Sequence, residues 1–131
     1  MIYGIGTDLI EIQRIERVLA RFGERFARRI LCDPELARFR GHRRPIAYLA
    51  KRFAAKEAFT KALGTGIRAP ANWHGVWVSN LRSGKPVLEF SPQLRALLES
   101  RGIHRSHVSL TDEREIAGAT VILETGPAVA P

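Results

Sequence analysis

Two acidic side chains stand at positions where solvent exposure is not the obvious reason for their presence. At 100° per residue, Glu57 falls within the apolar stripe that Ala50 and Phe53 mark on a predicted helix. Asp8 lies where a predicted strand becomes a helix. Burying an ionised carboxylate is costly without a cation, and Mg²⁺ commonly takes one or two protein carboxylates together with phosphates and water. A shared Mg²⁺ site is therefore one hypothesis for this pair.

Each carboxylate also has a simpler interpretation. Asp8 can be the N-cap of the helix that follows, with Glu11 as its partner in a D-x-x-E capping box. Glu57 can pair with Lys61 one helical turn later, or with an arginine. The residue pattern alone favours these structural interpretations over a shared metal site.

Lys61 and the Gly64-Thr65-Gly66 stretch after it are typical of a phosphate contact. A lysine supplies a point charge, and glycines let backbone N–H groups approach an oxyanion. The alternative is a glycine that ends the helix, with Lys61 complementing the helix dipole. The "GIGTD" near the N-terminus does not predict a dinucleotide site, because the third glycine of that fingerprint is missing.

The composition predicts one globular domain with an anionic partner. The chain has 131 residues, of which 45% are hydrophobic, and its 21 Lys and Arg against 13 Asp and Glu give a net charge of +8. Such a charge attracts nucleic acid, a phosphorylated metabolite or an acidic protein. No apolar run approaches the roughly 18 residues of a membrane span. The N-terminus lacks the basic region of a signal peptide, so we expect a cytoplasmic protein without a membrane partner.

Arginines recur three or four positions apart after the first predicted strand, opposite an apolar stripe. They are Arg14, Arg17, Arg21, Arg25 and Arg28. Only Glu11 and Glu24 lie near this sector, and the helix is expected to break near Gly23. The row is either solvated surface or the docking face for an acidic partner.

The elements that must position these groups follow from local signals. A strand over residues 1–8 precedes the arginine helix, and "CDPELARF" starts another helix with Asp33 as cap. The helix with Glu57 ends at Gly64, "RSGK" marks a hairpin turn, and Ser91-Pro92 opens a short helix. Two β-rich stretches follow. This order predicts an α+β fold, a small antiparallel sheet packed with helices. We expect one domain over residues 1–124 and a disordered tail over 125–131.

Three stretches, taken together, resemble the short trimeric type of 4′-phosphopantetheinyl transferase, the holo-[acyl-carrier-protein] synthases. They are "GIGTDLIEIQRI", "RFAAKEAFTKALGTGI" and "HVSLTDE…AGATVILE". The resemblance covers residues 1 to 124, in order and at matching spacing. It implies transfer of the phosphopantetheine arm of coenzyme A to a serine of an apo acyl carrier protein in fatty-acid synthesis, with release of adenosine 3′,5′-bisphosphate.

The resemblance also implies residue roles. Asp8 and Glu57 would hold Mg²⁺ against the pyrophosphate of coenzyme A, and Lys61 would contact the phosphates. Whether a carboxylate or a metal-bound water deprotonates the serine stays open. The residues implied to bind the coenzyme further along are Gly64, Thr65, Gly66, Ile67, Pro86 and His107. A role that some relatives give to a second histidine does not transfer, because Asp112 stands there.

The partners implied by the resemblance are an acidic carrier protein and further copies of the chain. Arg14, Arg21 and Arg28 would meet acids on the carrier, a pairing that steers encounter and weakens with salt. The family is typically homotrimeric, with each coenzyme site shared between neighbours. Sheet edges and apolar strand faces would be covered in such an assembly.

Two other functions fit the basic charge: a nucleic-acid-binding module and a Mg²⁺-dependent nuclease that uses the same carboxylates. Against the first, the arginine row lacks interleaved aromatic residues, and the sequence has no recognised DNA or RNA signature. We therefore expect no nucleic-acid partner. The nuclease predicts cleavage of nucleic acid in the absence of coenzyme A.

Overall fold

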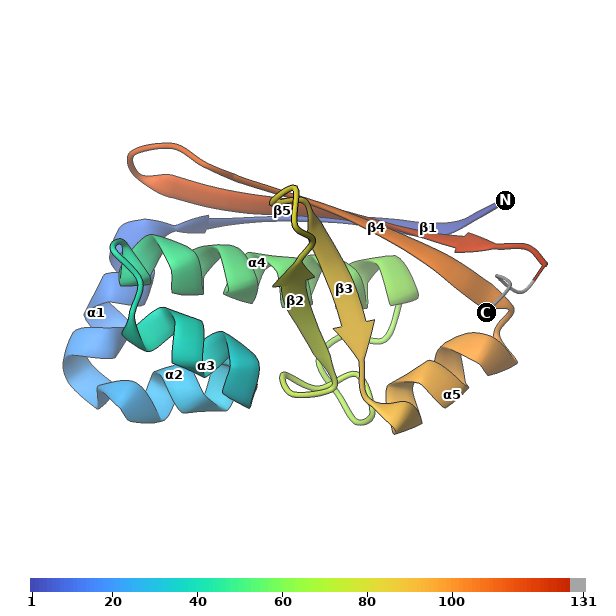
Figure 1. The fold of residues 1–131 in the computed structure, drawn as a ribbon, viewed down its shortest axis with the longest axis horizontal. Coiled ribbons are helices and arrows are strands. Elements are labelled where there is room, and N and C mark those ends of the chain that lie inside the picture. The colour runs from blue at the N-terminus through green and yellow to red at the C-terminus, as the bar shows by residue number, and fades with distance from the viewer. Residues whose placement is uncertain (128–131) are drawn as a thin grey trace.

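The computed structural model describes residues 1–127 of the chain. The elements are β1 (Ile2–Glu11), α1 (Ile12–Phe22), α2 (Glu24–Ile30), α3 (Asp33–Arg40), α4 (Pro45–Leu63), β2 (Val76–Asn80), β3 (Pro86–Phe90), α5 (Pro92–Ser100), β4 (Ile103–Asp112) and β5 (Ile116–Thr125). The predicted α+β fold and its order of elements are confirmed (Figure 1). The arginine helix breaks at Gly23, as predicted, and so becomes α1 and α2.

The strands form two antiparallel sheets rather than the single sheet predicted. The larger has the order β1-β5-β4, and the smaller is the β2-β3 hairpin. The central strand β5 pairs with β1 from Ile2↔Glu124 to Glu11↔Ile116, and with β4 from Ile103↔Thr125 to Asp112↔Ala117. Because the chain enters as β1 and returns as β5, the first and last elements lie side by side in one sheet.

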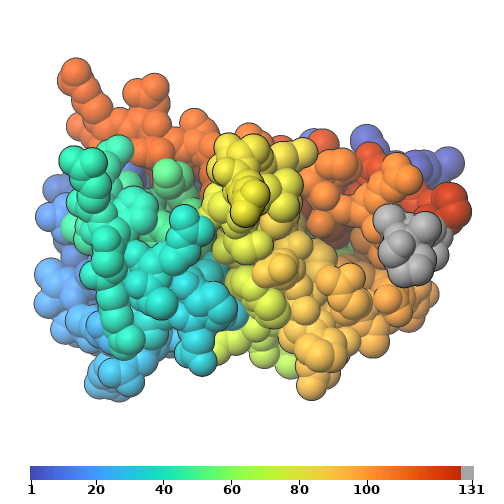
Figure 2. Space-filling model, viewed as in Figure 1, coloured from blue at the N-terminus to red at the C-terminus, as the bar shows by residue number. Residues whose placement is uncertain are grey.

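Helix α4 runs beneath the larger sheet and is buried on nearly all sides (Figure 1). In the space-filling view it is largely covered by α1 to α3, the hairpin and α5 (Figure 2). Two glycines of β1 allow the close approach of sheet and helix. A Cβ added at Gly4 would lie 2.0 Å from the carbonyl oxygen of Ala62, and one at Gly6 would lie 1.9 Å from that of Ala58. Only glycine leaves room for the helix backbone at these positions.

The N-cap prediction for Asp8 is wrong. Strand β1 continues to Glu11, and α1 begins at Ile12 without a side-chain cap. The backbone N–H of Ile12 donates instead to the carbonyl of Glu115, at 2.8 Å. Pairing with β5 keeps residues 8–11 extended, so Asp8 is left on the strand.

Other predicted boundaries are mostly confirmed. Gly64 ends α4 in the left-handed conformation, with φ of 87°, and the Ser91 hydroxyl accepts a hydrogen bond from the Leu94 N–H. The N-cap of α3 is Cys32 rather than Asp33. Strand β5 includes Thr125, which we had assigned to the tail. Residues 128–131, the rest of the predicted disordered tail, lie outside the described residues.

The larger sheet has an outer face that no element of the described chain covers. Since Gly4, Gly6 and Asp8 face α4, the alternate residues of β1 point outward. Ile5 is 62% exposed and Leu9 is 67% exposed. No helix within residues 1–127 is long and apolar enough to cross a membrane.

Candidate active site

Asp8 and Lys61 meet between β1 and α4. The Lys61 Nζ donates to Asp8 Oδ1 at 3.0 Å and to the backbone carbonyl of Thr7 at 3.0 Å. The Asp8 side chain is 16% exposed, whereas that of Lys61 is 53% exposed. The predicted proximity of an acid from the N-terminal strand and a lysine from the central helix is therefore present, across 53 residues of sequence.

Glu57 lies one turn before Lys61 on α4 and is half-buried. Its pKa is raised, first because burial disfavours the charged form and second because the charge of Asp8 repels it. Lys61 and Arg14 oppose this shift. Within residues 1–127, Glu57 has no ion pair, so its predicted alternative partner Lys61 serves Asp8 instead. We call Asp8, Glu57 and Lys61 the carboxylate site.

The carboxylate site fits a divalent cation. Two carboxylates that repel one another lie in a partly buried place, and in the described part of the chain only Asp8 of the two has an ion pair, with Lys61. Within the described residues, no group of three or more His, Cys, Asp or Glu side chains could hold a metal ion. Two carboxylate ligands match Mg²⁺, which keeps waters or substrate phosphates for its other positions, and they do not match a structural zinc site.

The loop after Lys61 brings the next predicted residues to the same end of α4. Gly64 and Gly66 have φ of 87° and 70°. The N–H groups of Gly64 and Thr65 still bond to the carbonyl of Thr60, and the Thr65 hydroxyl donates to the Gly66 carbonyl at 2.9 Å. Ile67 is half-buried. The same glycine-rich stretch therefore both ends α4 and forms the candidate phosphate loop.

His107 and Pro86 are not brought to the carboxylate site within one chain. His107 lies on β4, two strands from β1, and its register with Ile122 and Ile5 places it on the outer sheet face. Its Nε2 is 3.5 Å from Glu124 Oε1. Pro86 begins β3 in the separate hairpin sheet. A site that uses all the predicted residues therefore needs a second chain.

The predicted docking arginines are all exposed, but they are divided between two helices. Arg14 and Arg21 lie on α1, and Arg28 lies on α2 beyond Gly23. Arg28 also pairs with Glu24 at 3.6 Å. Arg14 is close enough to Glu57 to lower its pKa, so the cationic surface extends to the carboxylate site. We call α1 and α2 the arginine helices.

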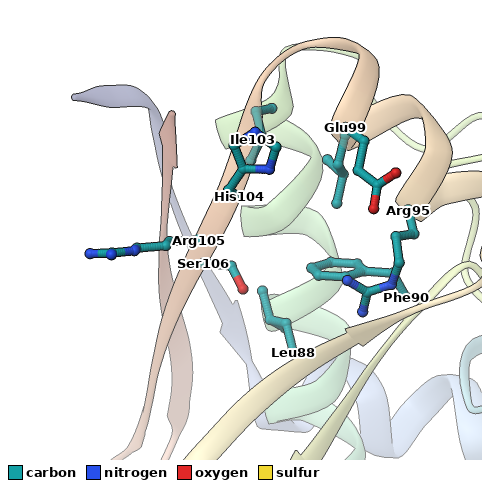
Figure 3. A pocket seen from close by; sticks show the side chains of 9 residues that line it. Leu88, Phe90, Arg95, Glu99, Ile103, His104, Arg105 and Ser106 are labelled. Atoms are coloured by element: carbon teal, nitrogen blue, oxygen red, sulfur yellow. The ribbon is translucent and has the colours of Figure 1, made fainter. Parts of the chain in front are cut away.

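One cleft of the chain lies away from the carboxylate site. It has a volume of about 500 Å³ and lies between β3, α5 and β4. Figure 3 shows Leu88 and Phe90 on one side and Ser106 on the other, with Arg105 pointing away. None of the predicted site residues lines this cleft. A second cleft, of about 390 Å³, is lined in part by Gly64 and Thr65 of the loop after Lys61.

Sequence reasoning missed a buried charge next to the site in the sequence. Lys56, next to Glu57, is fully buried in an ion pair with Glu35. The helical pattern could not reveal this, because α4 is buried on most sides and has no single apolar stripe. Asp112, which replaces a histidine of some relatives, pairs with Lys51 at 3.0 Å and Arg44 at 3.6 Å.

Fold and site together define an α+β protein in which two acidic side chains and a lysine meet between the first strand and the central helix, near a helix with exposed arginines. The chain belongs to the 4′-phosphopantetheinyl transferase superfamily, whose family model matches residues 4–119. It is 52% identical over 124 residues to the holo-[acyl-carrier-protein] synthase of Nitrosospira multiformis, covering 95% of this chain and 99% of that protein. It is also 52% identical to the enzyme of the same name from Vibrio cholerae, over 95% and 98% of the two chains.

Solved structures agree with this family assignment. The holo-[acyl-carrier-protein] synthase of Neisseria meningitidis matches with a TM-score of 0.93 and 46% identity, over 95% of this chain and 100% of that one. The Bacillus anthracis synthase, solved in complex with coenzyme A (3′,5′-ADP), matches with a TM-score of 0.81 and 38% identity, over 96% and 99% of the chains. The fold predicted from the sequence resemblance is thereby confirmed.

Proposed function

We propose that this protein transfers the 4′-phosphopantetheine arm of coenzyme A to a serine of an apo acyl carrier protein, as a holo-[acyl-carrier-protein] synthase of fatty-acid synthesis. Membership of the superfamily and identities of about half to enzymes of that name support it. The observation that carries it is the meeting of Asp8, Glu57 and Lys61 between β1 and α4. The expected cytoplasmic location stays a prediction.

Asp8 and Glu57 would hold the Mg²⁺. Bound there, the ion would polarise the phosphoryl group under attack and neutralise charge on the leaving group, adenosine 3′,5′-bisphosphate. Lys61 neutralises Asp8 in this structure, and its ammonium is exposed enough to turn toward a phosphate. Gly64, Thr65, Gly66 and Ile67 would line the path of the coenzyme beyond the phosphates.

The carrier protein would dock on the arginine helices. Arg14, Arg21 and Arg28 are exposed, and carrier proteins are strongly acidic. Arg14 lies near Glu57, so a partner held there by its acidic side chains would present its serine at the carboxylate site. Such pairing steers encounter and is screened by salt.

The protein would work as a homotrimer. The outer sheet face exposes Ile5 and Leu9, which a neighbouring copy would bury. His107 lies on that same face, so it would contribute to the coenzyme site of a neighbour. Pro86, in the separate hairpin sheet, is expected to do the same. At micromolar concentration, analytical ultracentrifugation is expected to give a molecular mass three times that of one chain. A monomer that is fully active would refute the shared site.

Intact-mass spectrometry tests the reaction. Apo carrier protein incubated with this protein, coenzyme A and Mg²⁺ is expected to gain the mass of one phosphopantetheine arm. Glu57→Gln should remove that gain while the far-ultraviolet circular dichroism stays unchanged. Cleavage of nucleic acid without coenzyme A would favour the nuclease instead. A salt-dependent gel shift tighter than the binding of coenzyme A would favour the nucleic-acid module.

A further inference from the structure

A buried ion pair lies one residue from Glu57. Lys56 of α4 is 0% exposed and Glu35 of α3 is 1% exposed, and Lys56 Nζ lies 2.7 Å from Glu35 Oε1. Two charges withdrawn from water are stable only when good geometry and further hydrogen bonds compensate their desolvation. Hydrophobic residues of similar size often stabilise as well or better. The groups around this pair therefore decide whether it could be replaced by apolar residues.

Every polar group of the pair has a partner. Lys56 Nζ also donates to the carbonyls of Ile30 and Trp73, each at 2.6 Å, so its three protons are all used. Glu35 Oε1 accepts the N–H of Cys32 at 3.0 Å, and its Oε2 accepts that of Val78 at 3.0 Å. Apolar replacements would leave four backbone groups unsatisfied, so the pair is not interchangeable with a hydrophobic contact.

The four backbone partners come from four places along the chain. Ile30 is the last residue of α2, Cys32 caps α3, Trp73 precedes β2, and Val78 lies within β2. The pair thus fixes the C-terminal end of the arginine helices to α4, at the residue that precedes Glu57. Their N-terminal end is fixed to the sheet through the hydrogen bond from Ile12 to Glu115. The arginine helices are thus anchored at both ends, at one end by the residue next to Glu57 in α4.

We propose that Lys56 and Glu35 are positioning residues that set the distance between the arginine helices and the carboxylate site. This inference rests on the proposed function. A carrier protein held by the arginines must place its serine against a phosphoryl group held elsewhere, and a misplacement of about 1 Å can cost about 100-fold in rate. Coenzyme A, bound at the carboxylate site itself, does not depend on this distance.

The first test is the kinetics of Glu35→Gln. The amide nitrogen cannot accept the N–H of Val78, so one anchor is lost and the other partners shift. For protein shown to be folded by circular dichroism, we expect the KM for carrier protein to rise about tenfold. The KM for coenzyme A should stay within about twofold. If the glutamine variant does not fold, Glu35→Asp keeps the charge but shortens the reach, and it should show the same split.

A double-mutant cycle separates positioning from loss of stability. In the parent protein, Arg28→Glu on α2 should lower kcat/KM for carrier protein. In the Glu35→Gln background, Arg28→Glu should lower kcat/KM for carrier protein several-fold less, because α2 is already displaced. Additive effects, or equal changes in both KM values, would overturn the proposal. So would a Glu35→Gln variant that is less stable but kinetically unchanged.

Glu24→Gln is the matched control. Glu24 also joins α2 to α3, through Arg40, and its loss changes the charge by the same amount at an exposed place. The KM for carrier protein should not rise. Hydrogen exchange gives a readout without catalysis: α2 amides should lose protection in Glu35→Gln but not in Glu24→Gln. If the parent protein transfers nothing to any carrier, the proposed function fails, and the exchange data still decide whether the pair anchors α2.

Discussion

Replacing Gly6 by alanine tests how the carboxylate site is assembled. The added Cβ would lie 1.9 Å from the carbonyl oxygen of Ala58, and Cβ atoms essentially never come closer than 3.0 Å to another heavy atom. Strand β1 and helix α4 must therefore separate by at least about 1 Å, because backbone atoms on both sides cannot rotate away. Overpacking of this kind costs about 1–3 kcal/mol, and we expect the upper end. Asp8, two residues along the same strand face, would move with β1.

Two measurements follow from that displacement. The denaturant midpoint, at fixed protein concentration, should fall by the equivalent of about 3 kcal/mol. The rate of phosphopantetheine transfer by the protein that remains folded should fall by about 100-fold, as expected when Asp8 is misplaced by about 1 Å. Gly41→Ala is the control, since nothing lies within 4 Å of its Cβ, and it should change stability by less than about 0.5 kcal/mol. A Gly6→Ala variant with unchanged stability and activity would refute the close approach.

Three further predictions concern charges. Because burial raises the pKa of Glu57, the folded protein holds that proton more tightly than the unfolded chain, and the ionised side chain lowers stability. Glu57→Gln should therefore raise Tm at neutral pH in metal-free buffer. The gain should shrink as pH falls through the raised pKa toward the ordinary glutamate value of 4.5 and vanish below it, and a constant difference would contradict this. Lys61→Gln should strengthen the binding of Mn²⁺ alone in calorimetry, because Lys61 competes with the ion for Asp8. The same change should weaken the binding of coenzyme A. Weaker binding of Mn²⁺ would contradict the competition. Arg14→Glu should raise the KM for carrier protein far more than the KM for coenzyme A. The rise should be smaller in high salt, because salt screens the pairing. The control Arg95→Glu, on α5, should change neither KM.

The sequence determined what depends on neighbours along the chain. The order of elements, the break at Gly23 and the caps at Gly64 and Ser91 are set by residues within one turn of each other. Local patterns were misleading where pairing between distant strands competed with a local helix signal. Asp8 has the spacing of an N-cap, but pairing of β1 with β5, more than 100 residues away in sequence, extends the strand past it. Local patterns carry no information about such a partner.

Only the tertiary structure decided which charges meet. Lys61 has Glu57 at the ideal helical spacing, yet it bonds to Asp8, because Gly4 and Gly6 bring β1 against the backbone of α4. The burial of Lys56 could not be predicted either, since its partners come from three other segments. Helical periodicity describes one helix in isolation, whereas the burial and pairing of a charge depend on everything packed around that helix.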